Sequence, residues 1–257
     1  MKGLWMKPAI LAAGLLASSA QAADARLKIV KALPFGGSSV QARSTPSLTA
    51  TPFYSNIATL QGGFTFGGTV SGTQPFGTTG LVTAMSCDDL SLAPGSPNGA
   101  YVLNDVTFSI ANADALGLQV APALIFYDQA TGAFIDVLRF DLMHVPGQTI
   151  AFVNADLGIL GSPITFARDG NGEANIWMCQ IYDDANGTAL DDDGNHVTPM
   201  QYDSLGAGFC NPPSVGSSPD NIYLSDTPIA SYATLPPGMQ GNLGGDPVAN
   251  YCNELGQ

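Results

Sequence analysis

Apolar and polar residues alternate along most of the chain, and this alternation limits the possible folds more than any other feature. In YVLNDVTFSIAN (101–112), the residues Val102, Val106, Phe108 and Ile110 share one parity, and the other parity is mostly polar. Similar patterns recur in four further segments, at 118–128, 133–143, 149–155 and 175–183. A period of two residues is typical of strands, and no window after residue 22 keeps the period of a helix.

Turn sequences separate the alternating segments. DQATGA (128–133), RDGNGEA (168–174) and DDANGT (183–188) carry glycine where a tight reversal needs a positive φ. With 30 glycines and 18 prolines, the chain is predicted to be all-β, an antiparallel two-sheet sandwich of jelly-roll type. We expect one domain over residues 51–257. The chain has no repeat of fixed period, which disfavours a propeller or a solenoid.

Two segments allow more detailed expectations. In NIWMCQIYD (175–183) we expect Trp177, Cys179 and Ile181 to face the core, with Met178 and Gln180 outward. In GFCNPPSVGSSPDNIYLSD (207–225) the two prolines exclude a helix and a regular central strand. We interpret this segment as a structural loop that leaves the sheet and re-enters it at 221–224. A ligand-binding loop is the alternative.

The first 22 residues have the pattern of a bacterial signal peptide. Lys2 and Lys7 precede a short apolar run, and AQA at 20–22 is a small-x-small cleavage site. The apolar run is too short to cross a bilayer comfortably, and no second run of spanning length follows. We therefore expect an exported protein that does not span a membrane, in the periplasm, at the cell surface or outside the cell. Residues 23–50 are interpreted as a flexible basic arm.

Charge is distributed very unevenly. Without Lys2 and Lys7 of the leader, the chain has six cationic and 21 acidic residues, which gives a net charge of −15. Only Arg139 and Arg168 lie beyond residue 43 among the cations. A body with so little positive charge is a poor partner for nucleic acid or for an anionic membrane.

Four cysteines, Cys87, Cys179, Cys210 and Cys252, make an even count in an exported chain. Two disulfides are expected, and three pairings are possible. A zinc site is disfavoured, because the nearest two cysteines are 31 residues apart and zinc sites use close pairs. We favour Cys210 with Cys252, because this bond would tie the proline-rich loop to the last strand.

Acidic loops raise the hypothesis of calcium binding. YDDANGTALDDDGNH (182–196) holds six candidate ligands, namely Asp183, Asp184, Asn186, Asp191, Asp192 and Asp193. Calcium takes six to eight oxygen ligands, which closely spaced Asp and Asn residues can supply. RDGNGE (168–173) and the pair Asp88–Asp89, placed at the start of a strand, are weaker candidates. The alternative for 182–196 is a solvated hairpin tip made of good turn formers.

Enzymatic interpretations have little support in the sequence. The two histidines, His144 and His196, lie at a predicted strand end and in the acidic loop, and no G-x-S-x-G motif occurs. A glycoside hydrolase needs two suitably placed carboxyl groups, and the only glutamates are Glu173 and Glu254. No catalytic residue and no required cofactor is assigned.

Several segments occur in an order that resembles one group of proteins. These are FYSNIATLQGGFTFGG, DDLSL, VTFSIAN, IFYDQATGAF, IWMCQIYDDANGT, FCNPPSVGSSPDNIYL and GGDPVANY, spread over about residues 53–252. The chain resembles exported bacterial β-sandwich proteins of the PEP-CTERM-associated type. The sequence ends in PVANYCNELGQ without a Pro-Glu-Pro signal, so the resemblance implies fold and location but no sorting to the membrane.

We therefore expect a non-enzymatic structural or adhesion protein of the cell surface or extracellular space, whose partners are extracellular polysaccharide or other surface proteins. A carbohydrate-binding module is the first alternative, and a secreted glycoside hydrolase is the second. Aromatic residues available for a binding platform are Tyr54, Tyr127, Trp177, Tyr182, Tyr202, Tyr223 and Tyr232, although Trp177 is expected in the core.

Overall fold

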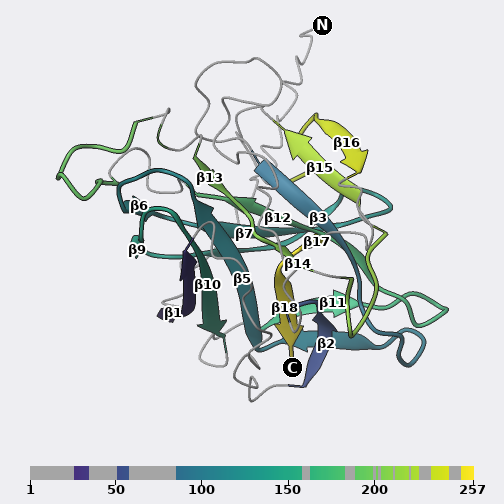
Figure 1. Ribbon diagram of the computed structural model, residues 1–257. Coiled ribbons are helices and arrows are strands. Elements are labelled where there is room, and N and C mark those ends of the chain that lie inside the picture. Colours follow the sequence, from purple (N-terminus) through teal and green to yellow (C-terminus); the bar gives the residue numbers. More distant parts are fainter. Residues whose placement is uncertain are drawn as a thin grey trace, which may run out of the picture.

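The computed structural model is built of β-strands joined by turns and loops (Figure 1). It describes residues 26–34, 51–57, 85–157, 163–182, 189–198, 201, 204–210, 212–219, 221–225, 233–242 and 250–257. The elements with defined bounds in this part of the chain are all strands. Every strand pairing is antiparallel.

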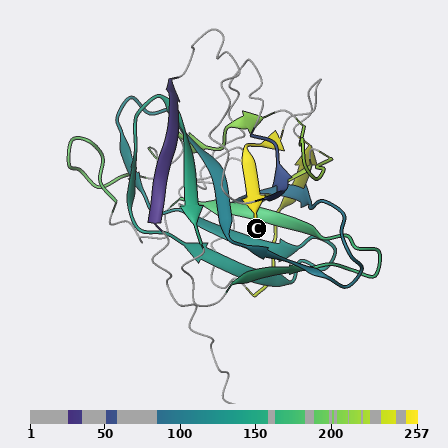
Figure 2. The same cartoon turned by 90° about the horizontal axis from the view of Figure 1, so that it is seen from below.

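Two six-stranded sheets form the sandwich. The first has the order β1 (Arg26–Pro34), β10 (Thr149–Asp156), β5 (Asp105–Asn112), β18 (Asn253–Gly256) and β2 (Pro52–Ser55), with β13 (Leu205–Gly206) paired to β5. The second has the order β16 (Met239–Asn242), β15 (Asn221–Ser225), β3 (Met85–Ser91), β12 (Asn175–Ile181), β7 (Ala123–Asp128) and β8 (Phe134–Arg139). Figure 2 shows the strands of the first sheet, from the purple β1 to the yellow β18, running across the direction of the second.

Three short strand pairs complete the described part of the fold. They are β4 (Ala100–Leu103) with β11 (Ile164–Ala167), β6 (Leu118–Val120) with β9 (Met143–Val145), and β14 (Phe209–Cys210) with β17 (Asn250–Tyr251). The predicted antiparallel two-sheet sandwich is confirmed. The jelly-roll connection of its strands stays a prediction.

The central core lies between the two sheets. Val106, Phe108 and Ile110 of β5 point into it, as their shared parity predicts, and all three are fully buried. Leu124 and Phe126 of β7 belong to the same cluster on the opposite sheet. Burial of each large apolar side chain stabilises the fold by about 1.5–3 kcal/mol, so this cluster holds the sheets together.

Strand β12 is buried on both faces, which the sequence did not predict. Met178 points into the central core, and the buried Gln180 contacts Asn253 of the first sheet, with Nε2 3.4 Å from Oδ1. Trp177 and Cys179 pack in a second cluster with neighbouring side chains of β3 and β7. The expectation that Met178 and Gln180 face outward is therefore wrong, because alternation separates two faces of a strand but cannot rank them when both are covered.

Two disulfides link the strands. Cys87 and Cys179 occupy directly paired positions of β3 and β12, in the middle of the second sheet. Cys210 of β14 is bonded to Cys252, which lies between β17 and β18. Of the three pairings left open by the sequence, the structure thus contains the one that includes Cys210–Cys252. Loops of 92 and 42 residues are closed.

Part of the predicted arm at 23–50 is a strand. Residues 26–34 form β1, which pairs with β10 from Arg26–Asp156 to Pro34–Thr149. Ile29 of β1 packs against the central core. Basic and small residues dominate this region, and the alternation around Ile29 is short. Its pairing partner, Val153, lies more than a hundred residues away. For 26–34 the description as a flexible arm is corrected.

The proline-rich loop returns to the sheet as predicted, since β15 begins at Asn221. Before that it crosses both sheets, because Val215 bridges to Ser55 of β2 and Ser217 bridges to Ser91 of β3. We call residues 212–219 the strap. The strap joins strands that belong to different sheets and carries Ser218 into a buried polar cluster described below.

Candidate functional site

The acidic loop at 182–196 is described from residue 189 onward. Asp183, Asp184 and Asn186, three of the predicted calcium ligands, lie outside the described residues. The Asp191 carboxylate accepts hydrogen bonds from the backbone amides of Asp193 (3.1 Å) and Asn195 (2.9 Å) and from the side-chain amide of Gln201 (3.0 Å). These hydrogen bonds, above all that from Gln201, lower the pKa of Asp191.

The two other described aspartates of this loop have different surroundings. Asp192 lies 2.7 Å from Nε2 of His144 and accepts a hydrogen bond of 2.8 Å from the amide of Gly117, so it holds the loop against β6 and β9. Asp193 is exposed. Asp191 therefore acts as a turn former and Asp192 as an anchor. Within the described residues, no group of three or more His, Cys, Asp or Glu side chains is arranged to hold a metal ion, and calcium binding by residues 183–193 stays a prediction.

A second acidic turn repeats the geometry of the first. The Asp169 carboxylate accepts hydrogen bonds from the amides of Asn171 (2.8 Å) and Glu173 (2.9 Å), which lower the pKa of Asp169. Gly172, three residues after Asp169, has a φ of +81°, and a Cβ there would lie 2.1 Å from the carbonyl oxygen of Gly95. The turn is thus fixed against its neighbour and holds its acidic side chains in a defined place.

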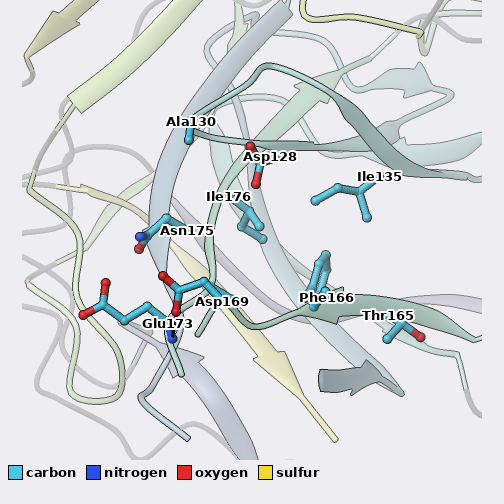
Figure 3. A pocket seen from close by; sticks show the side chains of 11 residues that line it. Asp128, Ala130, Ile135, Thr165, Phe166, Asp169, Glu173, Asn175 and Ile176 are labelled. Carbon is cyan, nitrogen blue, oxygen red and sulfur yellow. Dashed lines mark hydrogen bonds between the residues drawn. The ribbon is translucent and has the colours of Figure 1, made fainter. Parts of the chain in front are cut away.

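This turn forms one wall of a pocket of about 320 Å³ at the surface (Figure 3). The other walls come from the turn after β7, from β8, from β11 and from the start of β12. The lining residues are Asp128, Ala130, Ile135, Thr165, Phe166, Ala167, Asp169, Glu173, Ala174, Asn175 and Ile176. In Figure 3 Asp128 lies on one side and Asp169 and Glu173 on the other, with Ile176 between them.

The pocket combines an apolar floor with a rim of hydrogen-bond acceptors. Ile176 and Phe166 are buried and form the floor with Ile135. Asp128 uses one oxygen to accept hydrogen bonds from the amide (2.8 Å) and hydroxyl (2.6 Å) of Thr131. The charged residues of the rim are all acidic. Such a rim suits a neutral ligand with hydroxyl donors better than an anion.

Sequence reasoning did not find this pocket. The segments DQATGA and RDGNGEA were identified as turns, and RDGNGE also as a weak calcium candidate. Their meeting in space depends on the pairing of β7 with β12, shown by Tyr127 opposite Trp177. A single sequence carries no signal for which two turns meet.

Most of the described aromatic residues that were available for a binding platform are buried. Tyr54, Tyr127, Trp177 and Tyr182 are all buried, with at most 4% of their surface exposed. Tyr223 of β15 is partly exposed, packs beside Trp177, and donates its hydroxyl to the carbonyl of Pro236 at 2.6 Å. Tyr202 and Tyr232 lie outside the described residues. These buried rings stabilise the core and cannot stack on a sugar at the surface.

Both histidines are exposed, His144 in β9 and His196 in the acidic turn. Asp88 and Asp89, predicted at a strand start, lie instead in the middle of β3 and are both buried. Strand β3 begins at Met85, so the pair lies within the strand and not at its start. Burial makes the charged form of both carboxyl groups less favourable.

Comparison of the chain with protein-family models, with curated proteins and with solved structures finds no match. The resemblance to exported bacterial β-sandwich proteins therefore stays a prediction from the residues quoted above. Among the described residues, no helix is both long enough and apolar enough to cross a lipid bilayer.

Proposed function

We propose that this chain is an exported adhesion protein of the cell surface or extracellular matrix, which binds a neutral polysaccharide in the pocket of Figure 3. Its two disulfides fit an oxidising compartment outside the cytoplasm. The leader-like segment at 1–22 supports the same location. Its net charge of −15 after removal of that segment favours solubility there.

The observation that carries the proposal is the chemistry of the pocket. A sugar ring presents hydroxyl groups around its edge and C–H groups on its faces. Asp128, Glu173 and Asn175 offer acceptors for the hydroxyl groups, while Ile135 and Ile176 offer an apolar surface for the C–H groups. The hydrogen bonds of the turn at Asp169 hold the backbone of Glu173 in place, which reduces the loss of entropy on binding relative to a loose loop.

A secreted glycoside hydrolase is the competing function for the same pocket. A hydrolase needs a general acid that keeps its proton near neutral pH, which requires a raised pKa. In this pocket the backbone amides of Glu173 and Asn171 lower the pKa of Asp169. Asp169 is thus suited to accept hydrogen bonds from a ligand and poorly suited to be the general acid of a hydrolase.

The test is a depletion assay with insoluble polysaccharides. The mature protein is incubated with cellulose, chitin and a bacterial exopolysaccharide, and both the protein left in solution and the sugar released are measured. Depletion without sugar release supports the proposal. Sugar release identifies a hydrolase, and no depletion from any of the polysaccharides contradicts the assignment of this pocket.

Two variants localise the binding. Glu173→Gln and Asn175→Ala each change one acceptor at the rim, and each should weaken binding about tenfold, because a hydrogen bond to a charged or polar group is lost. Asp141→Asn, at an exposed acidic residue outside the pocket lining, is the matched control and should bind normally. Equal weakening in all three variants would point to a general charge effect.

A further inference from the structure

Asp88 and Asp89 are adjacent residues whose carboxyl groups are buried in the interior of the sandwich. Their side chains have 0% and 1% of their surface exposed. Asp88 faces the first sheet, where Nδ2 of Asn253 donates to its Oδ2 at 3.2 Å. Asp89 faces β15 and accepts from Nδ2 of Asn221 at 2.9 Å. The groups that donate to them are neutral amides and a hydroxyl, which do not balance two negative charges.

Several polar atoms around the pair lack a hydrogen-bond partner in the structure. Oδ1 of Asp88 is buried and makes no hydrogen bond. The Tyr54 hydroxyl is also buried, and the side chain that it contacts is Ser218. Burial and then the negative charges of the nearby Asp88 and Asp89 raise the pKa of Tyr54, while a hydrogen bond with Ser218 lowers it. Unpartnered buried oxygens are rare in folded proteins and each calls for a physical explanation.

The strap brings Ser218 into the cluster, where its hydroxyl has more acceptors nearby than it can donate to. Its Oγ is 2.8 Å from Oδ1 of Asp89 and 2.6 Å from Oδ1 of Asn250. A hydroxyl carries one proton and can donate to only one of these two oxygens. Nδ2 of Asn250 is buried without a partner. Turning that amide over would satisfy Ser218, but Oδ1 of Asp88 would still have no donor.

One carboxylate oxygen of the cluster, Oδ1 of Asp88, is therefore buried without a donor. Burial and mutual repulsion raise the pKa of Asp88 well above its usual value, and burial raises that of Asp89. A charge in such a place must be compensated by a proton or by a cation. One proton would satisfy one oxygen, whereas one cation can contact carboxylate, amide and hydroxyl oxygens together.

We propose that Asp88, Asp89, Asn250 and Ser218 form a binding site for a divalent cation of the calcium type, with Tyr54 beside it. The four residues come from β3, from β17 and from the strap, so a bound cation would join segments far apart in the sequence. Ser218 is partly exposed and gives the ion a route from solvent. The Ser218 oxygen lies at hydrogen-bonding distance, 2.8 and 2.6 Å, from Oδ1 of Asp89 and Oδ1 of Asn250, so three of the proposed ligand oxygens already lie together.

This site is distinct from the pocket of Figure 3 and from the acidic loop at 182–196. The proposal is therefore independent of polysaccharide binding. A cation here would act on the stability of the sandwich, because binding to the folded state alone shifts the unfolding equilibrium.

The test uses the full mature chain, stripped with a chelator and dialysed. Bound calcium is measured by equilibrium dialysis and elemental analysis, and the melting temperature is measured with and without calcium. We expect one equivalent that depends on Asp88, and a rise in melting temperature of about 5–10 °C when calcium is at a hundredfold its dissociation constant. Asp88→Asn removes one charge at constant shape and should abolish that equivalent and the thermal shift.

Two further variants keep the result interpretable. Ser218→Ala removes a partly exposed ligand with little risk to folding, and should weaken calcium binding at least tenfold. Asp191→Asn, in the acidic loop, should leave the equivalent intact. Loss in Asp191→Asn with retention in Asp88→Asn and Ser218→Ala would overturn the proposal in favour of the loop. A stripped protein that binds no calcium, with an infrared band of a protonated carboxyl that disappears in Asp88→Asn, would show that a proton compensates the pair.

Discussion

The backbone of Gly216 lies against the carbonyl group of Ser91, so closely that a Cβ on Gly216 would be 2.6 Å from the Ser91 oxygen. Gly216 also has a φ of +76°, a region that other residues avoid. On either side of it, Val215 and Ser217 bridge to β2 and β3. The strap can therefore follow the two sheets only because residue 216 has no side chain.

Gly216→Ala should destabilise the protein by about 2–4 kcal/mol, because a positive φ and a contact with fixed backbone are both penalised. Gly194→Ala is the matched control, since Gly194 has a φ of +78° but open space around its Cβ position. The free energy of unfolding of the control should fall only by the cost of a positive φ, about 1 kcal/mol. Urea unfolding of both variants measures the difference, and equal losses would mean that the contact with Ser91 relaxes freely.

The alternation of side chains was enough to predict the fold class and the core face of β5. Val106, Phe108 and Ile110 face the central core because the opposite parity is mostly polar. The same rule failed for Met178 and Gln180, where both faces of β12 are covered. Periodicity gives the two faces of a strand, but the choice of face depends on neighbours that one sequence does not reveal.

The candidate sites were harder to predict because they combine distant segments. Asp88 and Asp89 were noticed as an acidic pair, yet their burial depends on Ser218 and Asn250, which lie more than a hundred residues further along. The pocket likewise depends on how the turns after β7 and β11 meet across paired strands. Composition identifies residues able to bind a ligand, whereas their convergence is a property of the tertiary fold.

The two disulfides should contribute similarly to stability if loop entropy dominates. Closing loops of 92 and 42 residues restricts the unfolded chain by about 4 kcal/mol each. We expect Cys87→Ala/Cys179→Ala and Cys210→Ala/Cys252→Ala to lower the free energy of unfolding by comparable amounts in urea titrations. Both bonds are buried, so a clearly larger loss in one double variant would indicate that packing around that bond, and not loop length, dominates.

A pH dependence should arise where Asp105 of β5 lies directly opposite Asp156 of β10. Burial raises the pKa of Asp105, a hydrogen bond from Asn154 at 2.7 Å lowers it, and the charge of Asp156 raises it. The folded state thus keeps the Asp105 proton to a higher pH than the unfolded chain, whose pKa is about 3.9. Stability contributed by this group falls as pH rises from that value through the raised folded pKa.

Asp105→Asn removes the titrating group and keeps an acceptor for Asn154. The variant should be more stable than the wild type at pH 7, and the difference should shrink as the pH approaches 4. Thermal unfolding between pH 4 and pH 8 measures this, with the exposed Asp141→Asn as the control that should show no such trend. A variant less stable than the wild type at pH 7 would mean that the Asp105 charge is well compensated.

Strand β1 covers the edge of the first sheet, and its removal should expose β10. Residues 26–34 pair with Thr149–Asp156, and Ile29 packs on the central core. A mature chain that begins at residue 35 leaves backbone N–H and C=O groups of β10 open to pairing with a second copy. We expect it to melt at a lower temperature and to form dimers or larger species in light scattering.

The synthetic peptide RLKIVKALP should bind the shortened chain and restore the monomer, whereas a scrambled peptide should not. A shortened chain that stays monomeric, melts as the full chain does and ignores the peptide would show that β1 contributes nothing to the sheet edge.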